Sequence, residues 1–177
     1  MKLDTRQIVI SGLLVALALV LGVTGLGFIP VPTPAGAATL MHIPVELAGI
    51  LEGPVVGSFV GLIFGLFTLR FLADPRVVIP ARLLIGIVSY LVYAGCGKKA
   101  WSIPLAAIAG SLTNTIGTLG LAVLFGYMPL SGAEGAIGIA LLQGAPEAIF
   151  AAVIITPVVI AVKRLEARKP VPAHRGD

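Results

Sequence analysis

Six polar or ionisable side chains interrupt otherwise apolar stretches of this chain, and they are the groups best placed to bind a ligand or do chemistry. They are His42, Glu46, Arg82, Asn114, Gln143 and Glu147. Arg82 is the most informative, because a guanidinium cannot shed its charge and costs about 2.5–3.5 kcal/mol in a bilayer even on lenient insertion scales. Its planar fork can bind a carboxylate through two nitrogens. Arg82 therefore needs a partner: an internal carboxylate, water or an anionic ligand.

Structural roles for the same side chains stay open at this point. Glu46 or Glu147 could neutralise Arg82 as an ion pair. Asn114 could bond a neighbouring helix, and His42 could be a capping or snorkelling residue near the membrane interface. A shared binding site is favoured by convergence, because a rise of ~1.5 Å per helical residue puts groups from four predicted spans at similar depth.

Enzyme chemistry is poorly supported by the residue pattern. His42 and Glu46 have the spacing of two metal ligands on one helix face, but the only other histidine is His174 near the C-terminus. A catalytic metal site would therefore lack ligands, and the sequence has no Ser/His/Asp set or glycine-rich phosphate loop. The single cysteine, Cys96, excludes an intramolecular disulfide. We expect no catalytic residues, no metal and no cofactor.

Composition indicates that membrane helices position these groups. Of the 177 residues, 58% are apolar and 11% are charged, whereas soluble domains carry roughly 25% charged residues. Breaks at Pro, Gly and charged residues divide the apolar sequence into six spans, at 7–28, 39–52, 54–72, 78–95, 101–126 and 136–163. Most have the ~20 residues needed to cross a bilayer, but the second is short. The prediction is an all-α membrane protein with six transmembrane helices in a compact bundle.

Lysine and arginine positions predict how the bundle is oriented, because basic residues favour the cytoplasmic side. With the N-terminus inside, the inner segments hold Lys2, Arg6, Lys98, Lys99, Lys163, Arg164, Arg168, Lys169 and Arg175. The outer loops, which would be 29–38, 73–77 and 127–135 with the adjoining helix ends, hold only Arg70 and Arg76. Both termini are therefore expected in the cytoplasm. The transmembrane domain would cover 1–165, followed by a flexible tail over 166–177.

Four segments carry a more specific signal. The first is the run from Ala38 to Leu69, ATLMHIPVELAGILEGPVVGSFVGLIFGLFTL. The others are PARLLIG from Pro80, LTNTIGTLG from Leu112 and GAPEAI from Gly144. These segments, which cover spans two to six in order, resemble the substrate-binding (S) components of energy-coupling factor (ECF) vitamin transporters.

The resemblance implies a six-helix protein of the prokaryotic cell (inner) membrane that captures a vitamin at its outer face. Such a protein has no ATPase motif of its own. It docks on a transmembrane coupling subunit that is driven by two cytoplasmic ATPase subunits. Docking in this family uses a stripe of small residues on the first helix, for which the near matches here are Gly12, Ala16, Ala18 and Gly22.

Within that family, Arg82 and Asn114 look most like the pantothenate-type members. There the resemblance implies that the arginine pairs with the ligand carboxylate and the asparagine meets its amide or hydroxyls. The outer loops, chiefly 29–38, would act as a lid. The expected substrate-binding residues are Arg82, Asn114, Glu147, Gln143, His42 and Glu46.

Glu46 departs from the family pattern, which leads us to expect an apolar residue at this place. An ionised Glu46 would compete with an anionic ligand for Arg82, or would favour a ligand that bears a hydrogen-bond donor or a cation. Other S-component ligands (hydroxymethylpyrimidine, a pyridoxine-type vitamin or folate) therefore stay open beside pantothenate. A structural or regulatory membrane subunit that binds no small molecule and a membrane enzyme are the alternatives from other classes.

Overall fold

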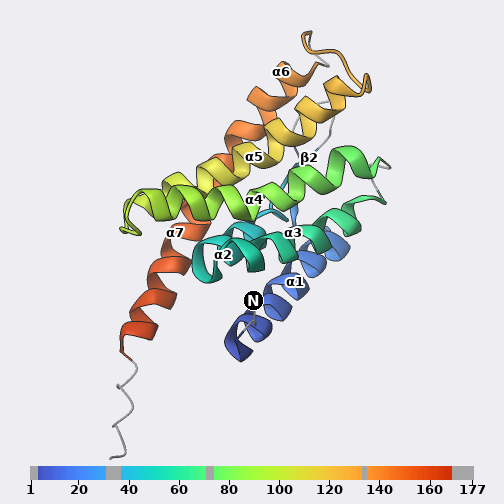
Figure 1. Cartoon of the computed structure of the whole chain (residues 1–177). Coiled ribbons are helices and arrows are strands. Elements are labelled where there is room, and N and C mark those ends of the chain that lie inside the picture. Colours follow the sequence, from blue (N-terminus) through green and yellow to red (C-terminus); the bar gives the residue numbers. More distant parts are fainter. Residues whose placement is uncertain (1–3, 31–36, 71–73, 133–134, 169–177) are drawn as a thin grey trace, which may run out of the picture.

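Apolar runs bounded by helix caps fold into a bundle of helices, which the computed structural model describes for residues 4–30, 37–70, 74–132 and 135–168 (Figure 1). The elements are α1 (Thr5–Thr24), β1 (Phe28–Pro30), β2 (Ala37–Thr39), α2 (Ile43–Glu52), α3 (Pro54–Thr68), α4 (Pro75–Gly95), α5 (Ser102–Leu124), α6 (Ala136–Ile139), the π-helical turn η1 (Ala140–Gly144) and α7 (Ala145–Ala167). Asp4 and Gln7 start α1 with a reciprocal capping box, and Gly25 ends it in a left-handed conformation (φ 77°).

The six apolar segments expected from the sequence are helical, although their boundaries differ. Helix α1 ends at Thr24, before 28, because the chain turns at Gly25. Helix α4 begins at Pro75, within the segment 73–77 that was expected to be a loop, because the Asp74 carboxylate caps it by accepting a hydrogen bond from the Arg76 N–H (2.8 Å). Helix α7 continues to Ala167. The remainder of the expected tail, from 169, lies outside the described residues.

Four helical segments are long and apolar enough to span a membrane, judged by length and composition: α1, α4, α5 and the continuous segment from α6 to α7. Helix α3 is apolar but has 15 residues, and α2 has 10. Ten residues extend about 15 Å, which is half of the ~30 Å hydrocarbon core. Helices α2 and α3 instead turn back on each other at Gly53, whose φ is 100°. Six crossings and the orientation of the termini stay predictions.

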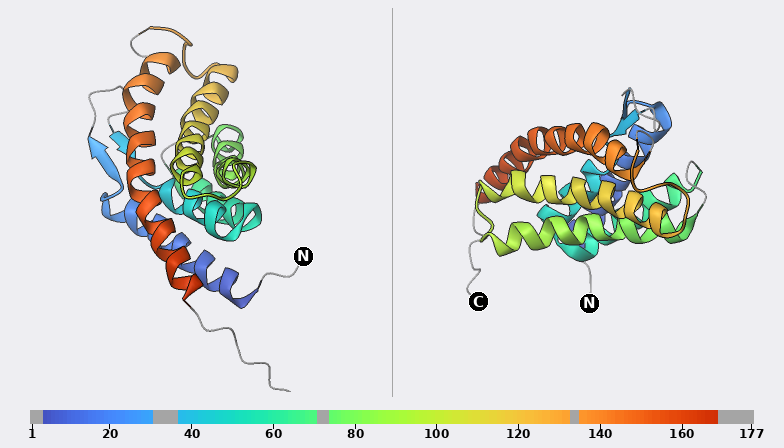
Figure 2. Two further views of the ribbon diagram at one scale, coloured as in Figure 1. Left: turned by 90° about the vertical axis from the view of Figure 1, so that its left-hand side faces the viewer. Right: turned by 90° about the horizontal axis from the view of Figure 1, so that it is seen from above.

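A short β-hairpin precedes α2, where the sequence had indicated only a loop. Strands β1 and β2 are antiparallel, with Phe28 opposite Thr39 and Ile29 opposite Ala38. The Leu40 N–H donates to the Gly27 carbonyl (2.7 Å) and extends the pairing. Strands of three residues are too short to give a readable alternation of polar and apolar residues. The hairpin lies beside α7 (Figure 2), while residues 31–36 of the expected lid fall outside the described residues.

Glycines bring α4 close to α2 and α3 and so determine where Arg82 lies. A Cβ added to Gly86 would come 2.5 Å from the Cα of Gly57, and one added to Gly49 would come 2.3 Å from the Gly86 carbonyl oxygen. A Cβ on Gly61 would come 2.3 Å from the carbonyl oxygen of Arg82. Small residues at this spacing let membrane helices approach closely. The glycine stripe of α3 therefore serves packing within the bundle.

The small residues of α1 divide between two faces. Ala18 is buried, and a Cβ added to Gly22 would come 2.5 Å from Met41 Cε and from the Phe67 ring. These two positions pack inside the bundle, which corrects the expectation that they face a docking partner. Gly12 and Ala16 are exposed, and a Cβ added to Gly12 would meet nothing within 4 Å in the described part of the chain.

A polar clamp ties the start of α4 to the end of α5. The Tyr127 hydroxyl donates a hydrogen bond to the Asp74 carboxylate, and Arg76 Nη2 lies 2.8 Å from Asp74 Oδ2. The Arg76 guanidinium also lies 4.7 Å from the centre of the Phe125 ring. Because α4 and α5 carry Arg82 and Asn114, this clamp holds together the two helices from which those side chains project.

The clamp makes stability depend on pH. Hydrogen bonds from Arg76 and Tyr127 hold the pKa of Asp74 well below its usual range. A lowered pKa in the folded state stabilises the fold above the unfolded-state pKa of about 4, and this contribution is lost as the pH falls through the folded-state value. The difference in thermal midpoint between wild type and Asp74→Asn, which keeps a capping side chain, should therefore shrink as the pH is lowered from about 7 towards 3. A constant difference would argue against the clamp.

Candidate functional site

Arg82 projects from α4 and is buried against α5 and α3, whose side chains orient it. Its Nη1 donates hydrogen bonds to Asn114 Oδ1 and to Thr118 Oγ1, the latter at 2.8 Å. Its guanidinium lies 4.7 Å from the centre of the Phe64 ring, which provides a cation–π contact. Two of the expected substrate-binding residues, Arg82 and Asn114, are therefore in direct contact.

No carboxylate oxygen lies within ion-pair distance of Arg82 among the residues that the structure describes. The ion pairs there join Arg6 to Glu52 and Glu166, and Arg76 to Asp74. His42 Nε2 lies 3.7 Å from Glu46 Oε1. Arg82 Nε is buried and has no hydrogen-bond partner among the described residues. A direct ion pair with Glu46 or Glu147, the structural alternative from the sequence, is thus not seen. The Nε edge of this buried guanidinium therefore has no partner among the described residues.

Glu147 is occupied by protein donors and connects three elements. Its Oε1 accepts a hydrogen bond from the Thr39 N–H (2.6 Å) and one from Gln143 Nε2 (3.3 Å). Its Oε2 accepts a hydrogen bond from the Thr115 hydroxyl (3.2 Å). Glu147 therefore tethers the base of the β-hairpin to α5 and α7. Gln143 and Glu147 are four residues apart and lie on one face of the last helical segment. Gln143 Oε1 has no partner among the described residues.

A π-helical turn positions Gln143 and Glu147, and the sequence analysis missed it. The turn η1 ends at Gly144, two residues before Pro146, which has no N–H to continue the ladder of helical hydrogen bonds. Gly144 packs against α5, since an added Cβ would come 2.9 Å from Thr115 Cγ2. Single π-helical turns are frequent at functional sites. The Gly-Ala-Pro sequence was the signal that could have indicated this irregularity.

His42 and Glu46 share the buried face of α2, as their spacing indicated. Both are fully buried, with His42 Nε2 3.7 Å from Glu46 Oε1. His42 precedes α2, but its side chain does not cap the helix. A Cβ added to Gly110 on α5 would come 2.2 Å from Ser89 Oγ and 2.8 Å from Glu46 Cγ. Ser89 on α4 is thus a buried polar neighbour of Glu46 that the sequence analysis did not single out.

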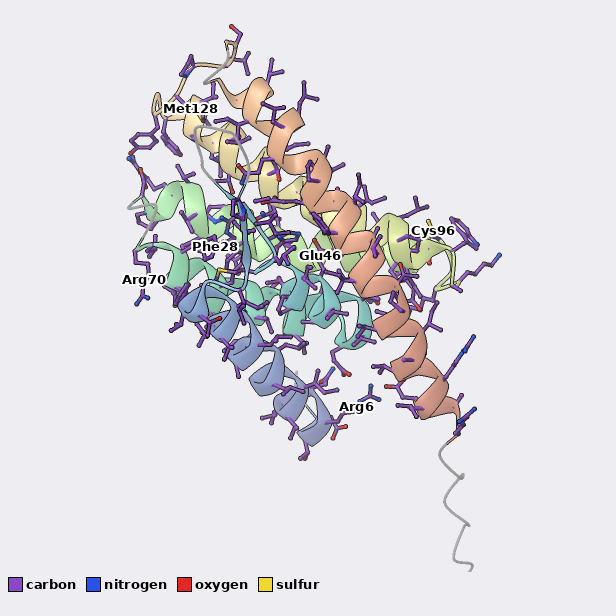
Figure 3. The ribbon with its side chains drawn as sticks, turned by 180° about the vertical axis from the view of Figure 1, so that it is seen from behind. Arg6, Phe28, Glu46, Arg70, Cys96 and Met128 are labelled. Carbon is purple, nitrogen blue, oxygen red and sulfur yellow. The ribbon has the colours of Figure 1, made fainter. Side chains whose placement is uncertain are left out.

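The polar residues from α2, α4, α5 and the last helical segment therefore form one buried band across the bundle. Glu46, the residue of this band labelled in Figure 3, lies in the middle of the molecule. On α5, Asn114 contacts Arg82 while Gly110 lies against Glu46 and Ser89, one helical turn or about 6 Å away. The arrangement can bind a small molecule that carries an anionic group. Among the described residues, no three His, Cys, Asp or Glu side chains are grouped as a metal site requires.

The chain is similar to known transporter proteins. Residues 6–160 match the family model described as "ECF transporter, substrate-specific component". The chain is also similar to the pantothenic acid transporter PanT of Lactococcus lactis subsp. cremoris, with 30% identity over 112 residues. This match covers 49% of the present chain and 57% of PanT, so the chain spans little more than half the length of that relative.

Because the Glu147 carboxylate accepts a hydrogen bond from the Thr39 N–H, removing it should reduce the protection of that N–H against hydrogen exchange. Replacing Glu147 with Ala removes the acceptor of the Thr39 N–H, so hydrogen exchange at Thr39 should accelerate several-fold. Gln143→Ala is the matched control, because it removes a donor to the same carboxylate and leaves the Thr39 bond in place. Exchange at Thr39 that is equally fast in wild type and Glu147→Ala would show that the carboxylate does not hold the hairpin.

Proposed function

Because the chain belongs to the family of ECF transporter substrate-specific components, we propose that it captures a small water-soluble vitamin, pantothenate first, and delivers it through an ATP-driven ECF complex. This is a family of transporter components and not of enzymes. The similarity to PanT supports the choice of pantothenate. The chemistry of the buried band supports it independently.

The observation that carries the proposal is a buried guanidinium with no carboxylate partner in the described residues. Pantothenate brings one carboxylate, which would bind along the unpartnered Nε edge of Arg82. Asn114 uses its carbonyl oxygen to hold Arg82, so its amide N–H groups would donate to the ligand's amide oxygen or hydroxyls. The bidentate, charge-assisted hydrogen bonds between an arginine and a carboxylate are among the strongest that proteins make.

The other expected contacts have different roles in this proposal. Gln143 would accept a hydrogen bond through its unpartnered Oε1. Glu147 would hold the hairpin against the site, because its oxygens already accept three hydrogen bonds. His42 would donate or accept an orienting hydrogen bond to the ligand beside Glu46 of α2.

The positive charge of Arg82 also distinguishes the candidate ligands from one another. Hydroxymethylpyrimidine and pyridoxine-type vitamins lack a carboxylate and would leave the Arg82 charge unpaired. Folate carries carboxylates and is the alternative that the same anchor could accept. A subunit that binds no small molecule would have to retain a buried unpaired charge, which is costly.

For the membrane orientation we infer that the hairpin end faces outwards and both termini lie in the cytoplasm. At the opposite end from Met128, Arg6 pairs with Glu52 (2.8 Å) and with Glu166, joining α1 to α2 and α7 (Figure 3). The transmembrane coupling subunit would dock on the exposed face of α1, at Gly12 and Ala16. Two cytoplasmic ATPase subunits would bind the cytoplasmic side of that coupling subunit.

Binding should depend on the Arg82 charge. Removing one member of a buried, hydrogen-bonded charge pair costs about 2–5 kcal/mol, so Arg82→Ala should weaken pantothenate binding at least about 30-fold in calorimetric titration of the purified protein. Arg70→Gln is the matched control, because Arg70 is an exposed arginine beyond the end of α3. Unchanged affinity in a folded Arg82→Ala protein would refute the anchor.

The identity of the vitamin can be tested without choosing it in advance. Mass spectrometry of small molecules that co-purify with the wild-type protein should detect pantothenate, and the Arg82→Ala protein should lack it. Recovery of a different vitamin in wild type would redirect the proposal to that ligand.

A further inference from the structure

Several polar atoms at the level of Glu46 are buried without a partner. Glu46, Ser89 and Ser111 have no exposed surface. Both carboxylate oxygens of Glu46 and the hydroxyl oxygens of both serines lack a hydrogen-bond partner among the described residues. These three side chains come from three helices, α2, α4 and α5.

Glu46 and Ser89 face the same point of α5. A Cβ placed on Gly110 would come 2.2 Å from Ser89 Oγ and 3.0 Å from Glu46 Cδ. Ser111 follows Gly110 directly in α5. The backbone of α5 at Gly110 therefore lies directly against Ser89 and Glu46, and a larger residue at this position would displace their polar groups.

Hydrogen bonding within the protein does not account for this carboxyl group. His42 Nε2 is 3.7 Å from Glu46 Oε1, which is too long for a hydrogen bond. Arg82 has no ion pair with Glu46 in the described part of the chain. A buried carboxyl group without hydrogen bonds is strongly unfavourable, whereas an apolar side chain of the same size would carry no such cost. The oxygens are best explained by a donor that arrives with the ligand.

We propose that Glu46, with Ser89 and Ser111, forms a second ligand subsite, which accepts hydrogen bonds from hydroxyl groups at the end of the ligand opposite its carboxylate. This inference rests on the proposed function. Arg82 and Ser89 are seven residues apart on α4, or about 10 Å along the helix axis. The ligand is therefore elongated, with an anion at one end and donors at the other. Pantothenate fits, with its carboxylate on the β-alanine part and its hydroxyls on the pantoyl part.

The test compares pantothenate with its analogue in which both hydroxyls are replaced by hydrogen, by calorimetric titration of the full-length purified protein. Wild type should prefer pantothenate by about tenfold or more, because each lost donor leaves a buried acceptor unpaired. Glu46→Met, which keeps the side-chain length and removes both acceptors, should reduce this preference to near one. Glu52→Gln is the matched control: it alters a carboxylate of the same helix, which pairs with Arg6, and should keep the preference.

The possible results distinguish failure of the second subsite from failure of the proposed function. A Glu46→Met protein that retains the wild-type preference, or a wild type that binds both compounds equally, would overturn the second subsite and leave the proposed function intact. A wild type that binds neither compound would overturn both. If Glu46→Met does not fold, Ser89→Ala and Ser111→Ala provide the same test, and a reduced preference in either supports the subsite while an unchanged preference in both overturns it.

Discussion

A permanently charged guanidinium buried between membrane helices must be satisfied by an opposite charge or by strong acceptors. In this protein Asn114 and Thr118 supply neutral acceptors to Arg82, and no carboxylate of the described residues pairs with it. The neutral acceptors orient the group without neutralising it. In the proposed function this charge binds the carboxylate of the ligand, and the other features of the bundle hold the guanidinium in position.

Three sets of contacts hold the helices and the hairpin around Arg82, and each set uses a different kind of interaction. Glycine contacts let α3 and α4 approach so closely that Gly61 touches the backbone of Arg82. The Asp74–Tyr127 hydrogen bond holds α4 to α5 beyond the site. Glu147 holds the hairpin to the last helical segment. Because the hairpin is held by Glu147 and not by the contacts that position Arg82, movement of the hairpin would leave those contacts in place.

The sequence was sufficient for features that depend on helical periodicity. Residues four apart, such as His42 and Glu46, lie on one face as expected, and apolar segments between Pro, Gly and charged residues became helices. Periodicity could not reveal features that depend on tertiary contacts. The strands of the hairpin are too short to show a pattern, the π-helical turn arises from one proline in context, and the burial of Ala18 and Gly22 depends on which face of α1 packs inwards.

Glu46 is a further residue whose role depends on tertiary contacts that the sequence does not show. Its departure from the family pattern was visible in the sequence, but the pattern alone could not distinguish competition for Arg82 from an independent role. In the structure Glu46 lies beside Ser89 and Gly110 and forms no ion pair with Arg82 among the described residues, which supports the independent role that we propose.

The most direct measurement is an experimental structure of the full-length protein with pantothenate bound. The central claim predicts that the ligand carboxylate lies within hydrogen-bond distance of the Arg82 guanidinium, including Nε, with Asn114 still in contact. A bound ligand whose carboxylate lies away from Arg82 would contradict that claim.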